Sequence, residues 1–343
     1  MQIGVLTGGG DCPGLNAAIR GVVRQAARQG WTVLGFRDGW AGVLAGEPEP
    51  LTIEATDPML AEGGTMLGST RTNPLRDPES FAKARAVFDR CRLQGLVVIG
   101  GDDTLSVAGA MAAKGDAVVG IPKTIDNDVP ETDVCIGFDT AVTTVSNAVG
   151  RVRTTAVSHR RVVVVETMGR DAGWLAAAGG LAGRADYIAV PERPIELAIL
   201  VSHVEGRAAR GLPFSVIVVA EGAEIVDLEV DPAEVHASDE FGHVQLSARG
   251  LGYAAAGALE NALGRSVPAM VLGYTQRGGP PTPFDRVLGT RCGVAAVDYL
   301  ASGDHGMLTA LQRNRIVPVP LADVAGRTRR LDASYLALLD LFD

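Results

Sequence analysis

Three short segments of the chain gather residue types that suit the chemistry of phosphoryl groups. They are GGGD (8–11), GGDDT (100–104) and PKTIDND (122–128). A glycine run before a helix can turn backbone N–H groups toward an anion. Paired carboxylates suit Mg²⁺ while it bridges phosphates, and a carboxylate beside a hydroxyl can accept its proton as the oxygen attacks phosphorus.

The first two segments also have a simple structural interpretation. The glycine run suits a tight turn from a strand into a helix, and it matches neither the dinucleotide-binding fingerprint nor the Walker A pattern. Asp102 or Asp103 could be the N-cap of the helix expected to follow. For the acid pair the capping role and the metal-binding role are compatible, so both stay open.

PKTIDND is the most specific of the three. Lys123 offers a positive charge to a phosphoryl group and Thr124 offers a hydroxyl. Asp126 and Asp128 are two residues apart, so they face the same side if the backbone there is extended. The alternative is an Asx-type turn in a surface loop. Because such a loop does not explain a Lys-Thr pair directly after an apolar run, a functional role is favoured.

Four arginines and one acid lie beside other apolar runs: Arg71, Arg161, Arg170, Arg277 and Glu221. An arginine can bind phosphate through two parallel hydrogen bonds, although for any single arginine solvation or a salt bridge is the ordinary interpretation. A buried Glu221 would be costly unless it bonds a group such as a sugar hydroxyl, or pairs with an arginine.

The elements that would position these residues alternate between short apolar runs and alanine-rich helical stretches. Most runs are apolar throughout, which predicts strands buried on both faces, as in the parallel sheet of a doubly wound α/β fold. Six runs lead directly into a glycine-rich or polar segment, and ligands bind at the carboxyl ends of parallel strands, so the pattern indicates an enzyme. The expected strands cover 3–6, 32–36, 96–99, 117–121, 162–165, 187–190, 216–219 and 269–272, and the expected helices 14–29, 104–113, 139–157 and 247–263.

Composition sets further limits. A length of 343 residues suits one large or two ordinary domains, and a hydrophobic content of 47% can fill a sizeable core. The 43 glycines show no Gly-X-Y period and are expected in turns and loops. A net charge of −9 without a basic tract argues against nucleic acid and anionic membranes as partners. Four scattered cysteines, no visible signal peptide and no span-length apolar stretch predict a cytoplasmic protein without a membrane span.

Taken together, the segments resemble the phosphofructokinase family. GVLTGGGDCPGLNAAIRGVV, GGDDT, PKTIDND, HRRVVVVETMGR, VAEG and QRGG follow the family's order and approximate spacing over about residues 2–300. The resemblance implies two doubly wound, mainly parallel-sheet α/β domains with the active site in the cleft between them. It implies a donor-binding domain of residues 1–138 and about 250–300, and a smaller sugar-phosphate-binding domain of about 139–250 and 301–343.

The resemblance also implies roles for individual residues. Asp126 is expected to accept the proton of the sugar 1-hydroxyl, with Lys123 and Asp103 as further catalytic groups and Asp102 as the ligand of Mg²⁺. The donor phosphate is expected at Gly10, Arg71 and Asp103. Fructose 6-phosphate is expected at Thr124, Asp126, Asp128, Arg161, Met168, Gly169, Arg170, Glu221, Tyr274 and Arg277. Arg161 matches an arginine that reaches into a neighbouring subunit, which implies a homodimer or homotetramer.

Two positions predict the phosphoryl donor. ATP-dependent members resemble GGDG, whereas diphosphate-dependent members have an aspartate at the position of Asp103 and a lysine at that of Lys123. A carboxylate at 103 would occupy the space of the ATP α-phosphate, and two like charges about 4 Å apart cost about 4 kcal/mol at an effective dielectric of 20. The expected reaction is therefore reversible, Mg²⁺-dependent transfer from inorganic diphosphate to fructose 6-phosphate, giving fructose 1,6-bisphosphate. The alternatives are an ATP-dependent 6-phosphofructokinase and a non-catalytic sugar-phosphate-sensing subunit of the same fold.

Some positions depart from the family pattern. Pro268 stands where a second cross-subunit arginine is expected, and Tyr274 replaces the usual histidine; Arg265 is a candidate substitute, and sedoheptulose 7-phosphate a conceivable alternative sugar. Three arginines match effector-site positions of regulated members: Arg20, Arg24 and Arg153.

Overall fold

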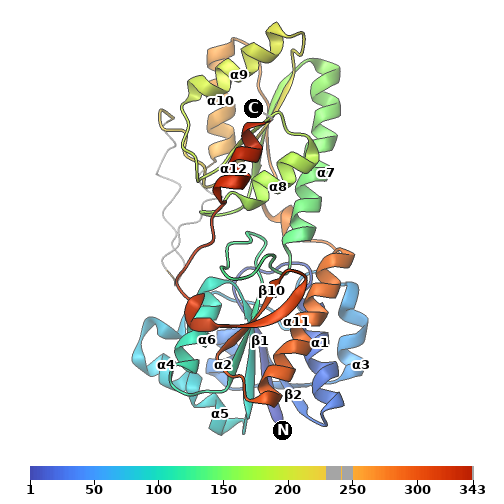
Figure 1. The fold of residues 1–343 in the computed structure, drawn as a ribbon, viewed down its shortest axis with the longest axis vertical. Coiled ribbons are helices and arrows are strands. Elements are labelled where there is room, and N and C mark those ends of the chain that lie inside the picture. Colours follow the sequence, from blue (N-terminus) through green and yellow to red (C-terminus); the bar gives the residue numbers. More distant parts are fainter. Residues whose placement is uncertain (229–240, 242–249, 342–343) are drawn as a thin grey trace. The chain divides into compact units, whose positions relative to one another are not determined.

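The computed structural model describes residues 1–228, 241 and 250–341, which form two compact units. Of the described residues, the first unit contains 1–140, 241 and 277–328, and the second contains 141–228, 250–276 and 329–341. The chain passes between the units inside the long helix α7 (Phe138–His159), after Gln276 and after Thr328 (Figure 1).

A seven-stranded sheet forms the centre of the first unit's described part, in the order β11-β10-β5-β4-β1-β2-β3. The neighbours from β10 to β2 run parallel, and only the outer strands β3 and β11 are antiparallel to their partners. The inner strands β4 and β5 are buried along their whole length, as apolar runs predict. The strands are β1 (Gln2–Thr7), β2 (Thr32–Phe36), β3 (Glu49–Leu51), β4 (Gly95–Gly100), β5 (Val118–Pro122), β10 (Met307–Gln312) and β11 (Arg315–Pro320).

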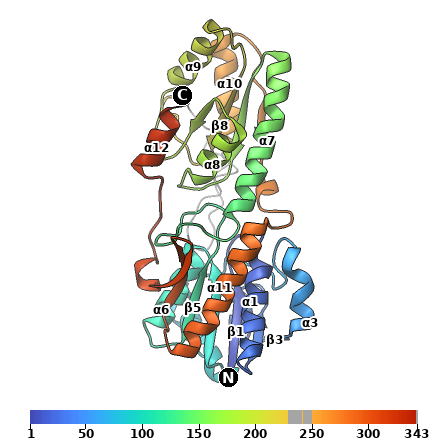
Figure 2. The same cartoon turned by 45° about the vertical axis from the view of Figure 1, so that its right-hand side comes forward.

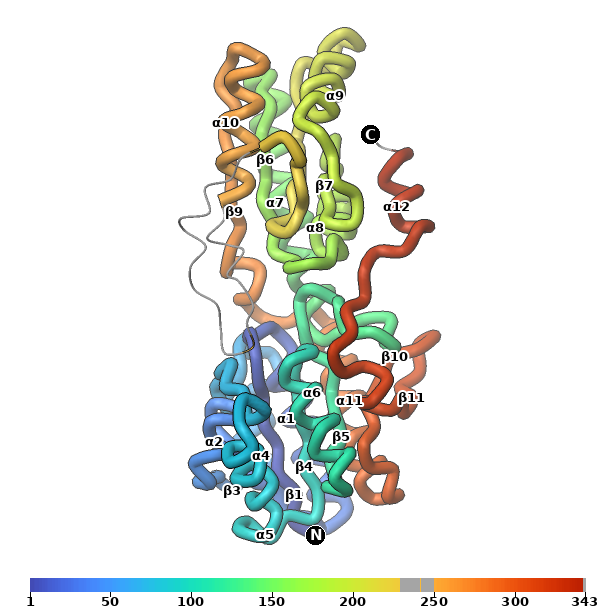
Figure 3. The backbone as a smooth tube through the Cα atoms, turned by 90° about the vertical axis from the view of Figure 1, so that its left-hand side faces the viewer, coloured from blue at the N-terminus to red at the C-terminus, as the bar shows by residue number. Residues whose placement is uncertain are grey.

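Helices cover both faces of this sheet. Helices α1 and α11 pack together on one face, while α4 and α6 lie on the other (Figures 2 and 3). The helices are α1 (Leu15–Arg28), α2 (Trp40–Ala45), α3 (Ile53–Thr56), α4 (Pro78–Arg85), α5 (Val87–Arg90), α6 (Asp102–Ala112) and α11 (Pro283–Ser302).

Glycines let α1 and α11 approach each other closely. A Cβ at Gly21 would lie 2.6 Å from the carbonyl oxygen of Thr290, and one at Gly293 would lie 2.3 Å from that of Ala18. The expectation that the excess glycines occupy turns and loops is therefore wrong for these positions, which are helical and lie where two backbones meet.

The described part of the second unit has a four-stranded, fully parallel sheet in the order β7-β8-β6-β9. Helices α7 and α8 touch where Gly179 and Gly183 leave room for Val145 and Val149, and α9 packs with α10. The elements are α7, β6 (Val162–Thr167), α8 (Trp174–Gly183), β7 (Tyr187–Ala189), α9 (Leu197–Ala209), β8 (Ser215–Ala220), α10 (Leu251–Leu263), β9 (Ala269–Val271) and α12 (Ala333–Asp340).

The expected fold class is confirmed, since both sheets are mainly parallel and helices separate their strands. The grouping of the chain differs from the expected domains in two places. Residues 301–328 belong to the first unit because β10 pairs with β5, and residues 250–276 belong to the second because β9 pairs with β6. The expected helix 247–263 is described from Leu251 onward, and its first residues lie outside the described part. No helix in the described part of the chain is long and apolar enough to cross a membrane.

Candidate functional site

The glycine loop after β1 is held by its neighbours more tightly than expected. The N–H of Gly8 donates to Ile99 O and that of Gly9 to Thr70 O, each at 2.9 Å. These two amides therefore do not face an anion, contrary to the expectation for the whole run. The backbone N–H groups of Gly10 and Asp11 are the loop's remaining candidates for binding an anion. Close packing against the buried Thr104 explains why position 8 is a glycine, since a Cβ there would lie 2.8 Å from the Thr104 side chain.

Two buried cations meet at Gly10. The ammonium of Lys123, only 2% exposed, donates from Nζ to Gly10 O at 2.5 Å. The guanidinium of Arg277, 8% exposed, donates to Asp11 O at 3.2 Å, and a Cβ at Gly10 would lie 2.6 Å from its Nη1. Burial lowers the pKa of Lys123. Both cations bond neutral carbonyl oxygens in the described structure, so the charges suit an anion that would bind at this end of the sheet.

The segment after β5 forms a turn, not an extended strand. Asn127 has φ of 54° and its side chain accepts from Cys135 N at 2.9 Å, so the condition under which Asp126 and Asp128 would face the same side, an extended backbone, is not met. Thr124 Oγ1 makes two hydrogen bonds with Asp126. It accepts from the backbone N–H of Asp126 at 3.1 Å and donates to Oδ2 of the carboxylate at 3.3 Å. The other carboxylate oxygen, Asp126 Oδ1, is buried and has no hydrogen-bond partner.

An unpartnered, buried carboxylate oxygen is costly in the protein alone, so it indicates a group that the protein does not itself supply. Asp126 is only 3% exposed and follows β5, beside the buried Lys123. A hydroxyl or a hydrated cation would satisfy this oxygen.

Asp102 and Asp103 lie in the first turn of α6, at the carboxyl end of β4, and both are partly exposed. The N-cap is Gly101, so neither aspartate has the capping role considered above. Negative charges in the first turn still stabilise the helix, because they interact favourably with the positive end of its dipole. Asp102 Oδ1 accepts from Gly326 N at 2.9 Å and from Ser106 Oγ at 3.4 Å.

The described residues hold no group of three or more His, Cys, Asp or Glu side chains that could bind a metal ion by themselves. The donor set still fits Mg²⁺, because this ion is ordinarily held by one or two carboxylates together with substrate phosphates and water. Asp102, in the first turn of α6, supplies such a carboxylate, and substrate phosphates and water would supply the remaining oxygens.

Arg71 is exposed and follows a segment that is bonded to the glycine loop. Ser69 Oγ donates to Gly9 O, and Gly9 N donates to Thr70 O, so both backbone polar groups of Gly9 are hydrogen-bonded to this segment. These bonds place the Arg71 backbone beside the loop that carries Gly10.

In the second unit, a buried carboxylate shapes the segment after β6. Glu221, 4% exposed, accepts through Oε1 from Gly169 N at 3.3 Å and Arg170 N at 3.1 Å. Gln276, fully buried, accepts from Met168 N at 3.2 Å. Glu221 thus supports the backbone of the Met168–Arg170 segment, a role that neither interpretation of its burial anticipated.

Tyr274 and Arg161 lie at opposite ends of this second sheet. Tyr274 is 75% exposed in the turn after β9, the strand that runs parallel to β6, and so it lies at the carboxyl end. Arg161 precedes β6 and is exposed at the amino end, seven residues or about 23 Å along the strand from Met168. Within one chain Arg161 is therefore not brought together with the other predicted sugar ligands.

Arg265 lies at the same amino end as Arg161. Its guanidinium donates to Arg160 O at 3.5 Å and to Pro213 O at 3.4 Å, while Pro268 O accepts from Val164 N. The arginine considered as a substitute for the missing one is thus next to the Arg160–Arg161 pair.

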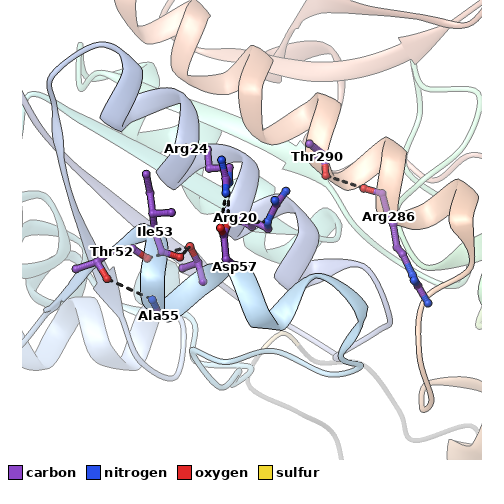
Figure 4. A network of polar contacts seen from close by, with 9 residues as sticks. Arg20, Arg24, Thr52, Ile53, Ala55, Asp57, Arg286 and Thr290 are labelled. Atoms are coloured by element: carbon purple, nitrogen blue, oxygen red, sulfur yellow. Dashed lines mark hydrogen bonds and ion pairs between the residues drawn. The ribbon is translucent and has the colours of Figure 1, made fainter.

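The arginines at the effector-like positions are paired with carboxylates. Arg20 Nε and Arg24 Nε both bond to Asp57 Oδ1, at 3.0 and 2.7 Å (Figure 4). Arg153 bonds to the buried Asp186 at 2.8 Å, at the wall of a cavity of about 420 Å³. This cavity and another of about 720 Å³ beside α9 contain none of the predicted site residues.

Sequence reasoning missed two buried groups that organise these segments. Gln276 was only part of a motif, and Asp285 stood in none of the motifs above; its hydrogen-bond partners are about 145 residues away in the sequence. The spacing of Thr282 and Asp285 with Pro283 between them marks a helix start, but it does not mark the burial of Asp285 or its bonds to α7.

A doubly wound fold with a buried lysine, an acid pair at the end of β4 and an unpartnered carboxylate oxygen fits a phosphotransferase that acts on a hydroxyl group. The comparisons with known proteins agree. Residues 2–300 match the family model described as Phosphofructokinase. The chain belongs to the phosphofructokinase family, whose members transfer phosphoryl groups with the help of a divalent metal ion.

Several curated relatives are similar along their whole length. The pyrophosphate–fructose 6-phosphate 1-phosphotransferase of Dictyoglomus thermophilum is 44% identical, with 100% of this chain and 98% of the relative covered. The protein of the same name from Amycolatopsis methanolica is 48% identical, with 96% of each covered. The ATP-dependent 6-phosphofructokinase 2 of Streptomyces coelicolor is also 48% identical, with 94% of each covered.

Solved structures support the fold. The crystal structure of a pyrophosphate-dependent phosphofructokinase from Marinobacter aquaeolei superimposes with a TM-score of 0.82 at 24% identity, covering 99% of this chain and 91% of that one. At this identity the likeness bears on architecture alone.

Proposed function

We propose that this chain is a diphosphate-dependent 6-phosphofructokinase. It transfers a phosphoryl group reversibly from inorganic diphosphate to the 1-hydroxyl of fructose 6-phosphate and forms fructose 1,6-bisphosphate, a step of glycolysis and gluconeogenesis. The observation that carries the choice of donor is the buried ammonium of Lys123 at the glycine loop. We also propose a cytoplasmic location, which free thiols at all four cysteines favour.

Charge supports diphosphate as the donor. Lys123 and Arg277 bring two positive charges to Gly10, and a small, highly charged anion gains most from such a concentrated field. Asp103, in the first turn of α6, adds a negative charge where a longer donor would carry its third phosphate. The full-length relatives named as pyrophosphate-dependent enzymes agree with this choice.

In the proposed reaction Asp126 accepts the proton of the sugar hydroxyl through its unpartnered Oδ1. Thr124 holds the other oxygen, which fixes the orientation of the carboxylate. Asp102 would hold Mg²⁺ together with the diphosphate, and the bound ion would neutralise charge on the transferred group. Gly10 and Arg71 bind the donor, and Asp128 assists at the sugar.

The second unit supplies most of the remaining sugar ligands in this proposal. Its segment Met168–Arg170, shaped by Glu221, binds the sugar together with Tyr274. Arg277, the last of the proposed sugar ligands, belongs to the first unit. Arg161 lies at the other end of β6, so it would act on the sugar phosphate of a neighbouring subunit in a homodimer or homotetramer. The predicted cleft between two domains stays a prediction.

A donor competition assay tests the proposal. With fructose 6-phosphate in excess, we expect kcat/KM for diphosphate to exceed that for ATP by at least about 100-fold, since about 4 kcal/mol of repulsion corresponds to three orders of magnitude before solvent screening. Phosphate release and fructose 1,6-bisphosphate are measured with each donor alone and with both. Preferred turnover of ATP would overturn the choice of diphosphate and favour the ATP-dependent alternative, whereas sugar binding without turnover of either donor would favour a sensing subunit.

Replacing Arg161 with Gln is expected to raise KM for fructose 6-phosphate by about 10- to 100-fold, because a charge-assisted hydrogen bond to phosphate contributes about 1.5–3 kcal/mol. KM for diphosphate should change little. The matched control is Arg160→Gln, an exposed neighbour at the same sheet edge, which should leave both constants near wild type. Equal effects of the two variants would contradict a specific role for Arg161.

A further inference from the structure

Asp285, in the first turn of α11, has a fully buried carboxylate that is bonded to the start of α7. Oδ1 accepts from Gly137 N at 2.9 Å. Oδ2 accepts from Thr140 N at 2.8 Å and from Thr140 Oγ1 at 2.5 Å. The carboxylate therefore fixes the residue before α7 and its first turn.

The two helix starts cap each other. Thr282, the N-cap of α11, accepts from Asp285 N at 3.3 Å and donates to Asp139 Oδ2 at 2.6 Å. Its own N–H donates to Thr140 Oγ1 at 3.0 Å. Three side chains, those of Asp285, Thr282 and Thr140, thus satisfy backbone N–H groups at the two helix starts, and Asp139 holds the Thr282 hydroxyl.

The segment that Asp285 holds lies directly against the residues after the glycine loop. Gly137 has φ of 97°, and a Cβ there would lie 2.4 Å from Cys12 Sγ. Cys12 Sγ donates to Ile136 O at 3.4 Å. A Cβ at Gly14 would lie 2.7 Å from Ile136 Cγ2 and 3.4 Å from Asp285 Cβ. The segment that Asp285 holds is therefore closely packed against the residues that follow the glycine loop.

The same segment continues to the proposed catalytic groups. Ile136 N donates to Pro122 O at 3.2 Å, and Ile136 forms a β-bridge with Lys123. Lys123 Nζ in turn holds Gly10 O. One layer of contacts therefore joins Asp285 to both the glycine loop and the buried lysine.

We infer that Asp285 is a positioning residue for the phosphoryl donor: by holding Gly137 and Thr140, it sets the distance between the glycine loop and Lys123. The inference rests on the proposed function only in naming diphosphate as that donor. Asp285 touches no reacting atom itself.

An aspartate suits this position because the site offers three donors to two oxygens. An asparagine would direct its NH₂ group at one of these N–H or O–H groups and leave it unsatisfied. All three donors are neutral, and burial raises the pKa of Asp285 to about 6, so the carboxylate is kept here at an energetic cost.

The test compares Asp285→Asn with wild type in kinetics and in binding. We expect KM for the donor to rise about tenfold or more, while KM for fructose 6-phosphate stays within about twofold, because only the donor loop loses its support. Calorimetric titration of diphosphate without sugar should show the same loss of affinity.

Further variants separate positioning from stability. Thr140→Val, which removes one of the three donors, should weaken donor binding in the same direction by a smaller factor, and Thr140→Ser should restore it. Asp77→Ala removes the cap of α4 at Ser80 N and should lower the melting temperature without changing donor KM. If Asp285→Asn does not fold, the Thr140 pair still decides the question. Unchanged donor affinity in these variants, or equal changes in both KM values, would overturn the inference.

The two proposals fail separately. If wild type uses ATP instead of diphosphate, the proposed donor is wrong, and the same variants are measured with ATP. If wild type uses diphosphate and the Asp285 and Thr140 variants lose stability alone, the positioning role is wrong and the proposed function stands.

Discussion

Replacing Asp126 with Asn is expected to lower kcat by about 10³-fold, within the range of about 10²- to 10⁴-fold that a general base contributes. Asp126 Oδ1 is buried and unpartnered, so in the proposed reaction it is the oxygen that receives the proton of the sugar hydroxyl. Asn keeps the size of the side chain and can still accept from Thr124, but it cannot take up a proton.

Steady-state kinetics and a sugar-binding titration together check this expectation. Fructose 6-phosphate should bind Asp126→Asn within about threefold of wild type, since the loss falls on the transition state. Asp128→Asn is the comparison, because it changes an acid two positions away that is less deeply buried. For Asp128→Asn we expect kcat/KM for fructose 6-phosphate to fall about tenfold, mainly through a higher KM. Near-normal kcat in Asp126→Asn would contradict its role as the base.

Replacing Asp103 with Gly is expected to raise kcat/KM for ATP by about 100-fold and to lower that for diphosphate. The like-charge cost of about 4 kcal/mol would correspond to about 10³-fold, but Asp103 is partly exposed, and solvent screening reduces the gain. Turnover with each donor, measured over a range of donor concentrations, gives both numbers.

Asp103→Asn separates charge from space. This variant removes the negative charge and keeps most of the volume, so an ATP gain close to that of Asp103→Gly would mean that repulsion excludes ATP. A gain in the glycine variant alone would mean that the side chain blocks the α-phosphate. A double variant that also replaces Lys123 with Gly should extend the change of donor. If neither single variant nor the double variant uses ATP better than wild type, Asp103 does not select the donor.

Much of the fold could be predicted because the local sequence patterns agree with the architecture that the whole chain adopts. The run 32–36 became β2 without change, and the runs beginning at Val162 and Val216 lie inside β6 and β8, since strands buried on both faces are apolar throughout. The polar segments after β4, β5 and β6 then follow at carboxyl ends, as parallel pairing requires.

The rest depends on contacts that no local pattern encodes. The amides of Gly8 and Gly9 are used by residues about 90 and 60 positions away, respectively, so their availability could not be judged from the glycine run. Asn127 has a left-handed backbone because its side chain caps Cys135 N, a bond made only in the folded chain. The burial of Asp285 likewise follows from α7 and α11 meeting, which sequence spacing does not reveal.

The hairpin of β10 and β11 has a consequence for how the family segment is delimited. The match to the family ends at residue 300, yet β10 covers an edge of β5, a strand that is buried along its whole length. A fragment cut at that boundary would present an apolar strand with unpaired backbone groups, the kind of surface through which chains aggregate edge to edge. The boundary of the family match at residue 300 and the boundary of the first unit's sheet, which ends with β11, therefore do not coincide in this protein.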